Sequence, residues 1–488
     1  MISIIKNAVR HSRTNCSDYG FVKQIVSALV AVSFLLSAAV AMAATINVNS
    51  DTEMVNLSGS DTININNCTL TLNNTENTTF SGPFKSTGNI IKTGSGTLTL
   101  THPVINYKGT TTVSEGKLKL DGNNLALTFS SEIINNGVIE TNCDQGFRNL
   151  SGTGAINVIG NSVDIDLVNT KDTTYSGSIT GADTIDVNAD VSIGAGTITL
   201  SGSISDVNRI IVGTLGQLKL TGAALDYNGS MTVFGGKSVE YEVASGAKRY
   251  NITNANKIDI EATSTGGTGS GKMIKSGDGT LQICCEADGL VRADSVFISS
   301  GRMDYQGYFE SAASFGSPTS PTDCFVVEEG AVFSPGIGVG NIILNSGNFT
   351  IRDSAIALFE FDAYNEDPAL QNFDTITING EFCKTVVNSN SIIQLAFANN
   401  DAEKWAKEGA EYHIITEGFT FKPNNGDYSY LLGNYSDYFK LEARQNEGFY
   451  LIGLGVPEPP MPVPEPSTWA LLILGVSGLL YVRKRVRS

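Results

Sequence analysis

Apolar and polar residues alternate in many short runs along this chain of 488 residues. In the run Thr97–Leu100 leucines alternate with threonines, and in the run Lys117–Leu120 leucines alternate with lysines. A period of two places the apolar side chains on one face of a β-strand and the polar side chains on the other. Glycines such as Gly94 and Gly116 stand between the runs, where turns need a positive φ. The pattern therefore predicts short strands joined by tight turns.

The same kind of unit is repeated along the chain. The Gly-x-Gly-Thr sequence at Gly94–Thr97 returns at Gly194–Thr197 and at Gly277–Thr280. The tetrapeptide Ser176–Ile179 returns as Ser201–Ile204 about 25 residues later, a spacing typical of one coil of a solenoid. A short strand that recurs in this way must stack on its neighbours to bury its apolar face. We therefore expect an all-β solenoid, with a pair of β-sandwiches as the alternative.

These units resemble the autotransporter-associated β-strand repeat of bacterial surface proteins. The resemblance is carried best by Gly88–Leu120, to a lesser degree by Lys272–Gly307, and weakly by the other copies. It implies a right-handed parallel β-helix, or β-solenoid, and we expect this fold for residues 44–320.

Residues 321–455 have a different pattern. The turn Ser334–Gly336, the strands after it and the stretch Phe373–Gly380 are similar to the end of autotransporter-type passengers. Because the open end of a solenoid exposes unpaired strand edges, we expect the last coils here to be covered by a β-rich cap. Asp401–Gly409 has a helical pattern, and the aromatic-rich stretch Tyr428–Tyr450 is expected to pack in this cap.

Residues 1–43 have the pattern of a secretory signal peptide, in which a basic segment precedes the apolar run Ile25–Val40. Small residues at Ala41 and Ala43 place the expected cleavage before Ala44, which then begins the mature chain. An uncleaved N-terminal anchor is the alternative, because the apolar run is long for a signal peptide. Both interpretations place the body of the chain outside the cytoplasm.

Residues 456–488 combine a rigid proline segment, an apolar run and a basic end. Pro464 and Pro466 keep the chain extended before the run, because proline fixes φ and lacks an N–H. The run Trp469–Val482 is shorter than the roughly 20 residues that cross a bilayer unaided, but the basic cluster after it holds that end at the cytoplasmic surface. We therefore expect a single C-terminal membrane helix, with an ordinary buried helix as the alternative. The basic cluster consists of Arg483, Lys484, Arg485 and Arg487.

In this order the three features resemble the PEP-CTERM sorting signal of exported bacterial proteins. The resemblance implies recognition by an exosortase, a membrane-embedded protease or transpeptidase, followed by delivery to the cell surface or extracellular matrix. An earlier copy, Val456–Pro459, lies farther from the apolar run, so we expect the second copy to be the one that is read. The expected motif consists of Val463, Pro464, Glu465, Pro466, Ser467, Thr468 and Trp469.

The charge of the chain limits its partners. The formal net charge is −17, and because the signal segment and the basic tail are both positive, the part between them carries about −24. Such a surface repels nucleic acid and anionic lipid headgroups, so we expect no nucleic-acid partner. The partners that we do expect are the exosortase and signal peptidase that process the chain, and extracellular polysaccharide or matrix.

The cysteine content leaves two interpretations open. One of the seven cysteines, Cys16, belongs to the signal segment, and the others are expected in an oxidising compartment, where disulfides and buried thiols are both possible. The histidines are few and no Cys-x-x-Cys pair occurs, so we expect no metal or cofactor. The remaining cysteines are Cys68, Cys143, Cys284, Cys285, Cys324 and Cys383.

The strongest candidates for chemistry are acidic. Asp164 and Asp166 share one face of a predicted strand, and Asp183 and Asp186 lie in a position where the next coil would bring them near. Some parallel β-helices are polysaccharide lyases or hydrolases that use carboxylates on an exposed sheet. Acidic residues at alternate positions are more often a solvated face. We therefore expect a non-catalytic structural or adhesive surface protein, with a carbohydrate-active enzyme as the alternative.

Overall fold

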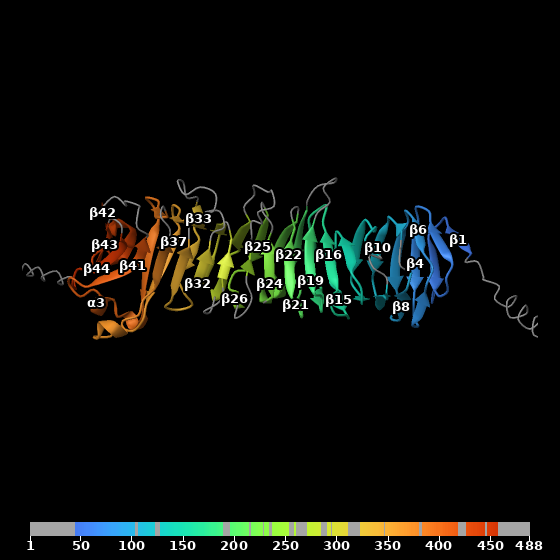
Figure 1. Ribbon diagram of the computed structural model, residues 1–488, viewed down its shortest axis with the longest axis horizontal. Helices are drawn as coiled ribbons and strands as arrows, with labels where there is room; N and C mark the ends of the chain where they lie inside the picture. The colour runs from blue at the N-terminus through green and yellow to red at the C-terminus, as the bar shows by residue number, and fades with distance from the viewer. Residues whose placement is uncertain are drawn as a thin grey trace, which may run out of the picture.

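The strands of the protein form one elongated stack that runs from β1 at one end to β44 at the other (Figure 1). This computed structural model describes residues 44–456 apart from 103–105, 123–126, 189–195, 214–215, 228, 234–236, 253–257, 260–270, 285–289, 294, 311–322, 346, 380–382, 418–425 and 445–446. The expected signal segment before Ala44 and the expected sorting segment after Val456 lie outside the described residues.

The described elements are almost all short strands. In chain order they are β1 (Thr45–Val48), β2 (Thr52–Val55), β3 (Thr62–Ile65), β4 (Thr69–Asn73), β5 (Thr78–Phe80), β6 (Phe84–Ser86), β7 (Asn89–Thr93), β8 (Thr97–Leu100), β9 (Asn106–Tyr107), β10 (Thr110–Val113), β11 (Lys117–Leu120), β12 (Glu132–Asn135), β13 (Val138–Thr141), β14 (Gln145–Arg148), β15 (Ala155–Val158), β16 (Asp164–Val168), β17 (Thr173–Tyr175), β18 (Ser178–Thr180), β19 (Thr184–Asn188), β20 (Thr197–Leu200), β21 (Ile204–Ser205), β22 (Arg209–Val212), β23 (Gln217–Leu220), η1 (Gly222–Asp226), β24 (Ser230–Val233), β25 (Ser238–Glu242), β26 (Lys248–Ile252), β27 (Ile258–Asp259), β28 (Lys272–Ser276), β29 (Thr280–Cys284), β30 (Leu290–Arg292), β31 (Ser295–Ile298), β32 (Arg302–Glu310), β33 (Asp323–Val327), β34 (Val332–Ser334), β35 (Asn341–Asn345), β36 (Asn348–Ile351), β37 (Ile356–Phe361), η3 (Pro368–Leu370), β38 (Thr375–Asn379), β39 (Thr385–Val387), β40 (Ile392–Phe397), η4 (Ala398–Asn400), α3 (Ala402–Trp405), β41 (Glu411–Glu417), β42 (Gly426–Asp427), η5 (Ser429–Tyr435), β43 (Phe439–Arg444) and β44 (Gly448–Gly453).

The strands are arranged as a three-sided parallel solenoid. The consecutive strands β3, β4 and β5 pair with β6, β7 and β8, and near the other end β35, β36 and β37 pair with β38, β39 and β40. Each of these pairings is parallel, so the chain returns to the same face after three strands. The expected all-β parallel solenoid is confirmed in this form, and the β-sandwich alternative is wrong, because antiparallel strands pair only at the C-terminal end of the described stack.

The predicted alternation sets the register of the coils. Leu98 of β8 pairs with Leu118 of β11, and all four leucines of these two strands are buried in the core that runs through the coils. Ile179 of β18 pairs with Ile204 of β21, as the repeated tetrapeptide predicts. The coils differ in length, since bonded asparagine side chains in adjacent coils are 17 residues apart near β1 and 34 residues apart near β38.

Side-chain oxygens at the corners bind one coil to the next. Asp51, Asn77 and Asp172 each accept a hydrogen bond of 2.8 Å from the backbone N–H of a threonine that begins a strand in the following coil. A coil corner would otherwise leave this N–H without a strand partner. The abundance of Asn, Asp and Thr therefore has a structural cause in addition to solubility.

Two lysines of equivalent repeats point into the solenoid. Lys92 and Lys275 are 1% and 0% exposed. The Lys275 Nζ donates to the carbonyl oxygens of Ser276, Gly277 and Ser300 at 2.9, 2.7 and 3.0 Å. Burial lowers the pKa of Lys275 to about 8, while the three carbonyl contacts favour its charged form.

Lys92 makes the same set of contacts in its own coil. Its Nζ donates to the carbonyl oxygens of Thr93, Gly94 and Glu115 at 2.8, 2.7 and 3.1 Å. The third carbonyl belongs to the following coil, so the ammonium joins two coils at one corner. A Cβ at Gly116 would lie 2.9 Å from the Lys92 Nζ and 2.3 Å from the Gly94 oxygen, so this corner requires glycine.

We expect Lys275→Met to lower the free energy of unfolding by about 2 kcal/mol or more, because three carbonyl oxygens lose their donor in a buried corner. Lys272→Met is the matched control, since Lys272 is exposed on the same strand and only lies near the Phe297 ring. Its expected cost is below about 1 kcal/mol. Urea unfolding followed by circular dichroism measures both values, and equal losses would show that the buried ammonium does not stabilise the corner.

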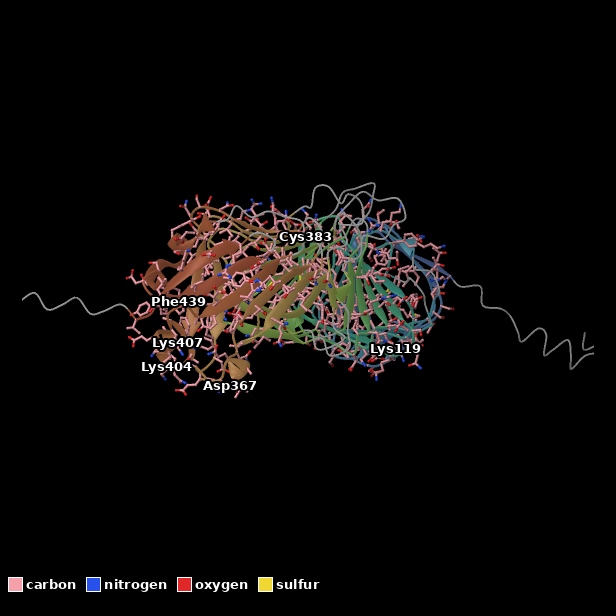
Figure 2. The ribbon with its side chains drawn as sticks, turned by 60° about the vertical axis from the view of Figure 1, so that its left-hand side comes forward. Lys119, Asp367, Cys383, Lys404, Lys407 and Phe439 are labelled. Carbon is pink, nitrogen blue, oxygen red and sulfur yellow. The ribbon has the colours of Figure 1, made fainter. Side chains whose placement is uncertain are left out.

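The C-terminal end is covered as expected. β41 pairs antiparallel with β44, which pairs antiparallel with β43. Phe361 lies between the rings of Phe397 and Trp405, with centroids at 4.7 and 5.1 Å, so the end of the core is closed by aromatic side chains. The predicted helix is limited to one turn, α3. Figure 2 shows Lys404 and Lys407 at this end of the stack and Lys119 near the opposite end.

Candidate functional site

Most of the residues expected to direct processing lie outside the described part of the chain. This applies to the sorting motif Val463–Trp469, to the basic cluster, and to Ala41 and Ala43. Ala44 is described and is exposed at the first coil. Within the described residues no helix is long and apolar enough to cross a bilayer. The expected membrane helix, Trp469–Val482, falls outside that range and stays a prediction.

The acidic residues form a column on the outer face of β16 and β19. Asp166 pairs in register with Asp186 of the next coil, as expected for carboxylates on adjacent coils. Asp164 lies on the same face of β16, while the alternate residues Ile165 and Leu167 point into the core. Asp183 lies apart at the corner before β19, where it accepts a 2.7 Å hydrogen bond from the Asn208 side chain.

The stacking of like charges changes the ionisation of this column. Partial burial, together with Asp166 and Asp164, raises the pKa of Asp186 to about 6, and Arg209 partly opposes the shift. Partial burial and the charges of Asp164 and Asp144 also raise the pKa of Asp166. A carboxylate pair with separated pKa values is a feature of acid–base catalysis, but repulsion between stacked aspartates produces it without any substrate.

We expect Asp186→Asn to stabilise the protein at pH 7.5 by about 1 kcal/mol and to have no effect near pH 4. The pKa of Asp186 in the folded state lies above its ordinary value, so this carboxyl loses its proton at lower pH in the unfolded chain than in the folded chain. The wild type therefore loses stability as pH rises from about 4 to about 6. Chemical unfolding at both pH values measures the difference.

The exposed loop residue Glu366 provides the control, as Glu366→Gln should give the same small change at both pH values. A gain for Asp186→Asn that is equal at pH 4 and pH 7.5 would contradict the repulsion.

Other charges on the outer faces are paired across coils with opposite charges. Lys117 Nζ lies 2.5 Å from a Glu140 oxygen on the neighbouring strand, and Lys219 Nζ lies 3.3 and 3.1 Å from Glu240 and Glu242. Opposite charges on adjacent strands stabilise the stacking. The aspartate column therefore differs from these ladders in having carboxylates next to one another.

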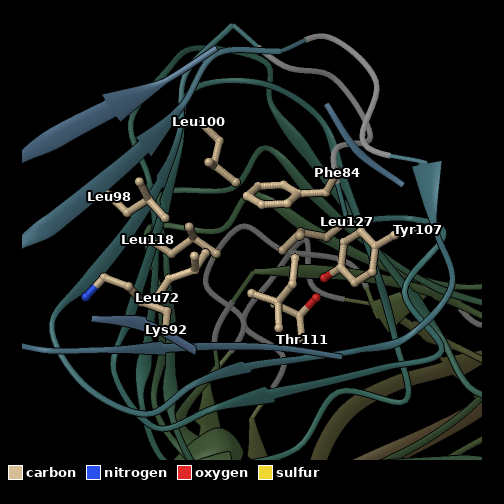
Figure 3. A pocket seen from close by; sticks show the side chains of 10 residues that line it. Leu72, Phe84, Lys92, Leu98, Leu100, Tyr107, Thr111, Leu118 and Leu127 are labelled. Atoms are coloured by element: carbon tan, nitrogen blue, oxygen red, sulfur yellow. The ribbon is translucent and has the colours of Figure 1, made fainter. Parts of the chain in front are cut away.

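A small cavity lies inside the N-terminal coils, among the side chains shown in Figure 3. Its volume is ≈ 10 Å³, about the least that holds one water molecule. Leu98, Leu100 and Leu118 line it together with Phe84 and Tyr107. The cavity is a packing defect of the core and is too small to bind a substrate.

The described acidic residues and cysteines form no recognisable metal centre. Among the described residues, no three His, Cys, Asp or Glu side chains are arranged to hold a metal ion. Cys68 carries a free thiol, with its Sγ 3.2 Å from the Val48 oxygen. The choice between a disulfide and free thiols stays open for Cys284 and Cys285, whose side chains lie outside the description.

One buried carboxyl was not identified from the sequence. Asp374 is fully buried and accepts hydrogen bonds from the backbone N–H groups of Gly340 and Glu360 at 2.7 and 2.8 Å. Burial raises its pKa to about 8. Asp374 links two elements, because Gly340 lies in the loop before β35 and Glu360 lies in β37. Its role is therefore structural. Asp374 stands in the stretch Phe373–Gly380, whose pattern is the one feature of the sequence that indicates a special role for this residue.

Comparison with known proteins finds a distant and partial similarity. The chain is 26% identical, over 411 residues, to the adhesin BmaC autotransporter of Brucella suis biovar 1 (strain 1330). The match covers 73% of this chain and 11% of that protein, so the chain spans about a tenth of its relative's length. No family model and no solved structure matches the chain, and the resemblance to PEP-CTERM proteins stays a prediction.

Proposed function

We propose that this protein is an exported, non-catalytic structural or adhesive component of the cell surface or extracellular matrix. The observation that carries the proposal is the long parallel solenoid, whose outer faces carry charged side chains paired across coils, as at Lys117–Glu140 and Lys219–Glu240. The similarity to an autotransporter adhesin supports it. A surface of this kind binds a polymer weakly at many points, so that avidity replaces a single deep site.

The route to the surface is also a proposal. A signal peptidase removes residues 1–43, the C-terminal helix holds the chain transiently in the inner membrane, and an exosortase acts at Val463–Trp469. The order of proline segment, apolar run and basic end supports this route.

A carbohydrate-active enzyme on the same scaffold is the second candidate. The observation that favours it is the in-register pair of Asp166 and Asp186, because glycoside hydrolysis uses two carboxyl groups close together. The pair lies on the outer face of the solenoid, whereas the described cavity is inside the coils and lined mainly by apolar side chains. We therefore favour the structural or adhesive function.

The two functions differ in what happens to a bound polysaccharide. We expect the exported protein to be retained on washed matrix from its producing cells and to leave soluble matrix polysaccharide unchanged in molecular mass. Sedimentation measures retention, and size-exclusion chromatography with a reducing-end assay measures cleavage. A fall in polysaccharide mass that is abolished by Asp166→Asn and Asp186→Asn would establish the enzyme and overturn the adhesive proposal.

The sorting route is tested at Glu465. We expect the native surface protein to end near Pro466, whereas a Glu465→Ala variant keeps its tail and stays in the membrane. Intact-mass analysis of both proteins distinguishes the products. Glu458→Ala, in the earlier Val456–Pro459 copy, is the matched control and should be processed normally. A native protein that retains Arg483 and the residues after it would contradict exosortase processing.

A further inference from the structure

Ala44 is held at the open end of the solenoid by both of its backbone polar groups. Its N–H donates to Asp61 Oδ1 at 2.8 Å, and its carbonyl oxygen accepts a 2.8 Å hydrogen bond from the N–H of Thr62. The next residue, Thr45, pairs in register with Thr62 as the first pair of β1 and β3. The Asp61–Thr62 corner therefore sets where the first strand begins.

The contact between Ala44 and Asp61 runs in the opposite direction to the corner contacts near it. Asp51 and Asn77 accept from an N–H in the following coil. At Ala44 the N–H belongs to the first coil, and the acceptor is a carboxylate of the following coil. Ala44 is exposed and Asp61 is partly exposed, so this contact lies at the surface of the solenoid.

This nitrogen belongs to the peptide bond at which the small residues Ala41 and Ala43 predict cleavage. Hydrolysis adds one water across the bond: the C–N bond breaks, Ala43 keeps a carboxylate, and the Ala44 nitrogen becomes an α-ammonium at neutral pH. A neutral amide contact with Asp61 is then replaced by an ion pair at the same position.

We infer that Ala44 is the processed N-terminus and that its α-ammonium forms an ion pair with Asp61 that anchors the first coil. This inference rests on the proposed export. The N-terminal end of the solenoid therefore carries the ion pair of the Ala44 α-ammonium and the Asp61 carboxylate only after processing. β1, β2 and β5 are the last strands of their sheets at this end, and charged groups on edge strands oppose pairing with other chains.

The test uses the exported protein purified from producing cells as wild type, Asp61→Asn and Asp51→Asn. The Asp61→Asn side chain keeps an oxygen that accepts the hydrogen bond, so only the charge changes. Asp51→Asn is the matched control, because Asp51 is another aspartate of the first coils that accepts a 2.8 Å bond, from Thr69. Mass spectrometry of the N-terminal peptide identifies the first residue and gives the rate of acetylation of the α-amine between pH 6 and 9.

We expect the mature chain to begin at Ala44. A nearby carboxylate raises the pKa of an α-amine above its ordinary value of about 8, which leaves less of the reactive neutral amine. Asp61→Asn should therefore raise the acetylation rate at pH 7 about three-fold or more, whereas Asp51→Asn should leave it close to that of the wild type.

Two results would overturn the inference and leave the proposed function intact: an exported chain that begins at another residue, or an Asp61→Asn variant that is acetylated at the wild-type rate. A chain that stays inside the cell with Met1 attached would overturn the proposed export and the inference together.

Discussion

The structure depends on parallel, in-register stacking of coils around one continuous core. A strand of four or five residues buries too little apolar surface to be stable by itself, and it gains stability only from the coils before and after it. The ends are therefore the weak points. The C-terminal end is closed by antiparallel strands and by the aromatic cluster around Phe361 and Trp405. At the N-terminal end Val55 of β2 is 62% exposed, and the first coil is held by pairing of β1 with β3, by the buried Val48 and by the contact of Ala44 with Asp61.

Polar groups inside and between the coils make this stacking specific. Apolar alternation excludes a shift of one residue between coils but allows a shift of two, whereas the Asn and Asp caps at the corners each require one particular backbone N–H. The inward ammonium groups of Lys92 and Lys275 act in the same way, because each needs three carbonyl oxygens from two coils. The cost of burying these charges is offset only in the correct register.

The outer faces explain why no single site dominates the molecule. Ion pairs such as Lys117–Glu140 neutralise charge locally, and the column with Asp166 and Asp186 leaves a region of concentrated negative charge. Repetition distributes similar polar groups along a long surface, which suits many weak contacts with a polymer. The proposed adhesive function draws on this repetition and on the distant similarity to an autotransporter adhesin, of which the match covers about a tenth.

The sequence by itself determined the strand pattern, the inward leucines of β8 and β11, the coil length near Ile179 and Ile204, and the presence of a capped end, because all of these follow from local alternation and turn chemistry. It did not reveal that Lys92 and Lys275 point inward, since a charged residue in a strand is normally solvated. Only the tertiary structure decided which residues lie above one another. Coil lengths vary from 17 residues between β1 and β3 to 39 residues between β38 and β41. The pairing of Asp166 with Asp186, the burial of Asp374 and the contact of Ala44 with Asp61 therefore depend on how each coil closes.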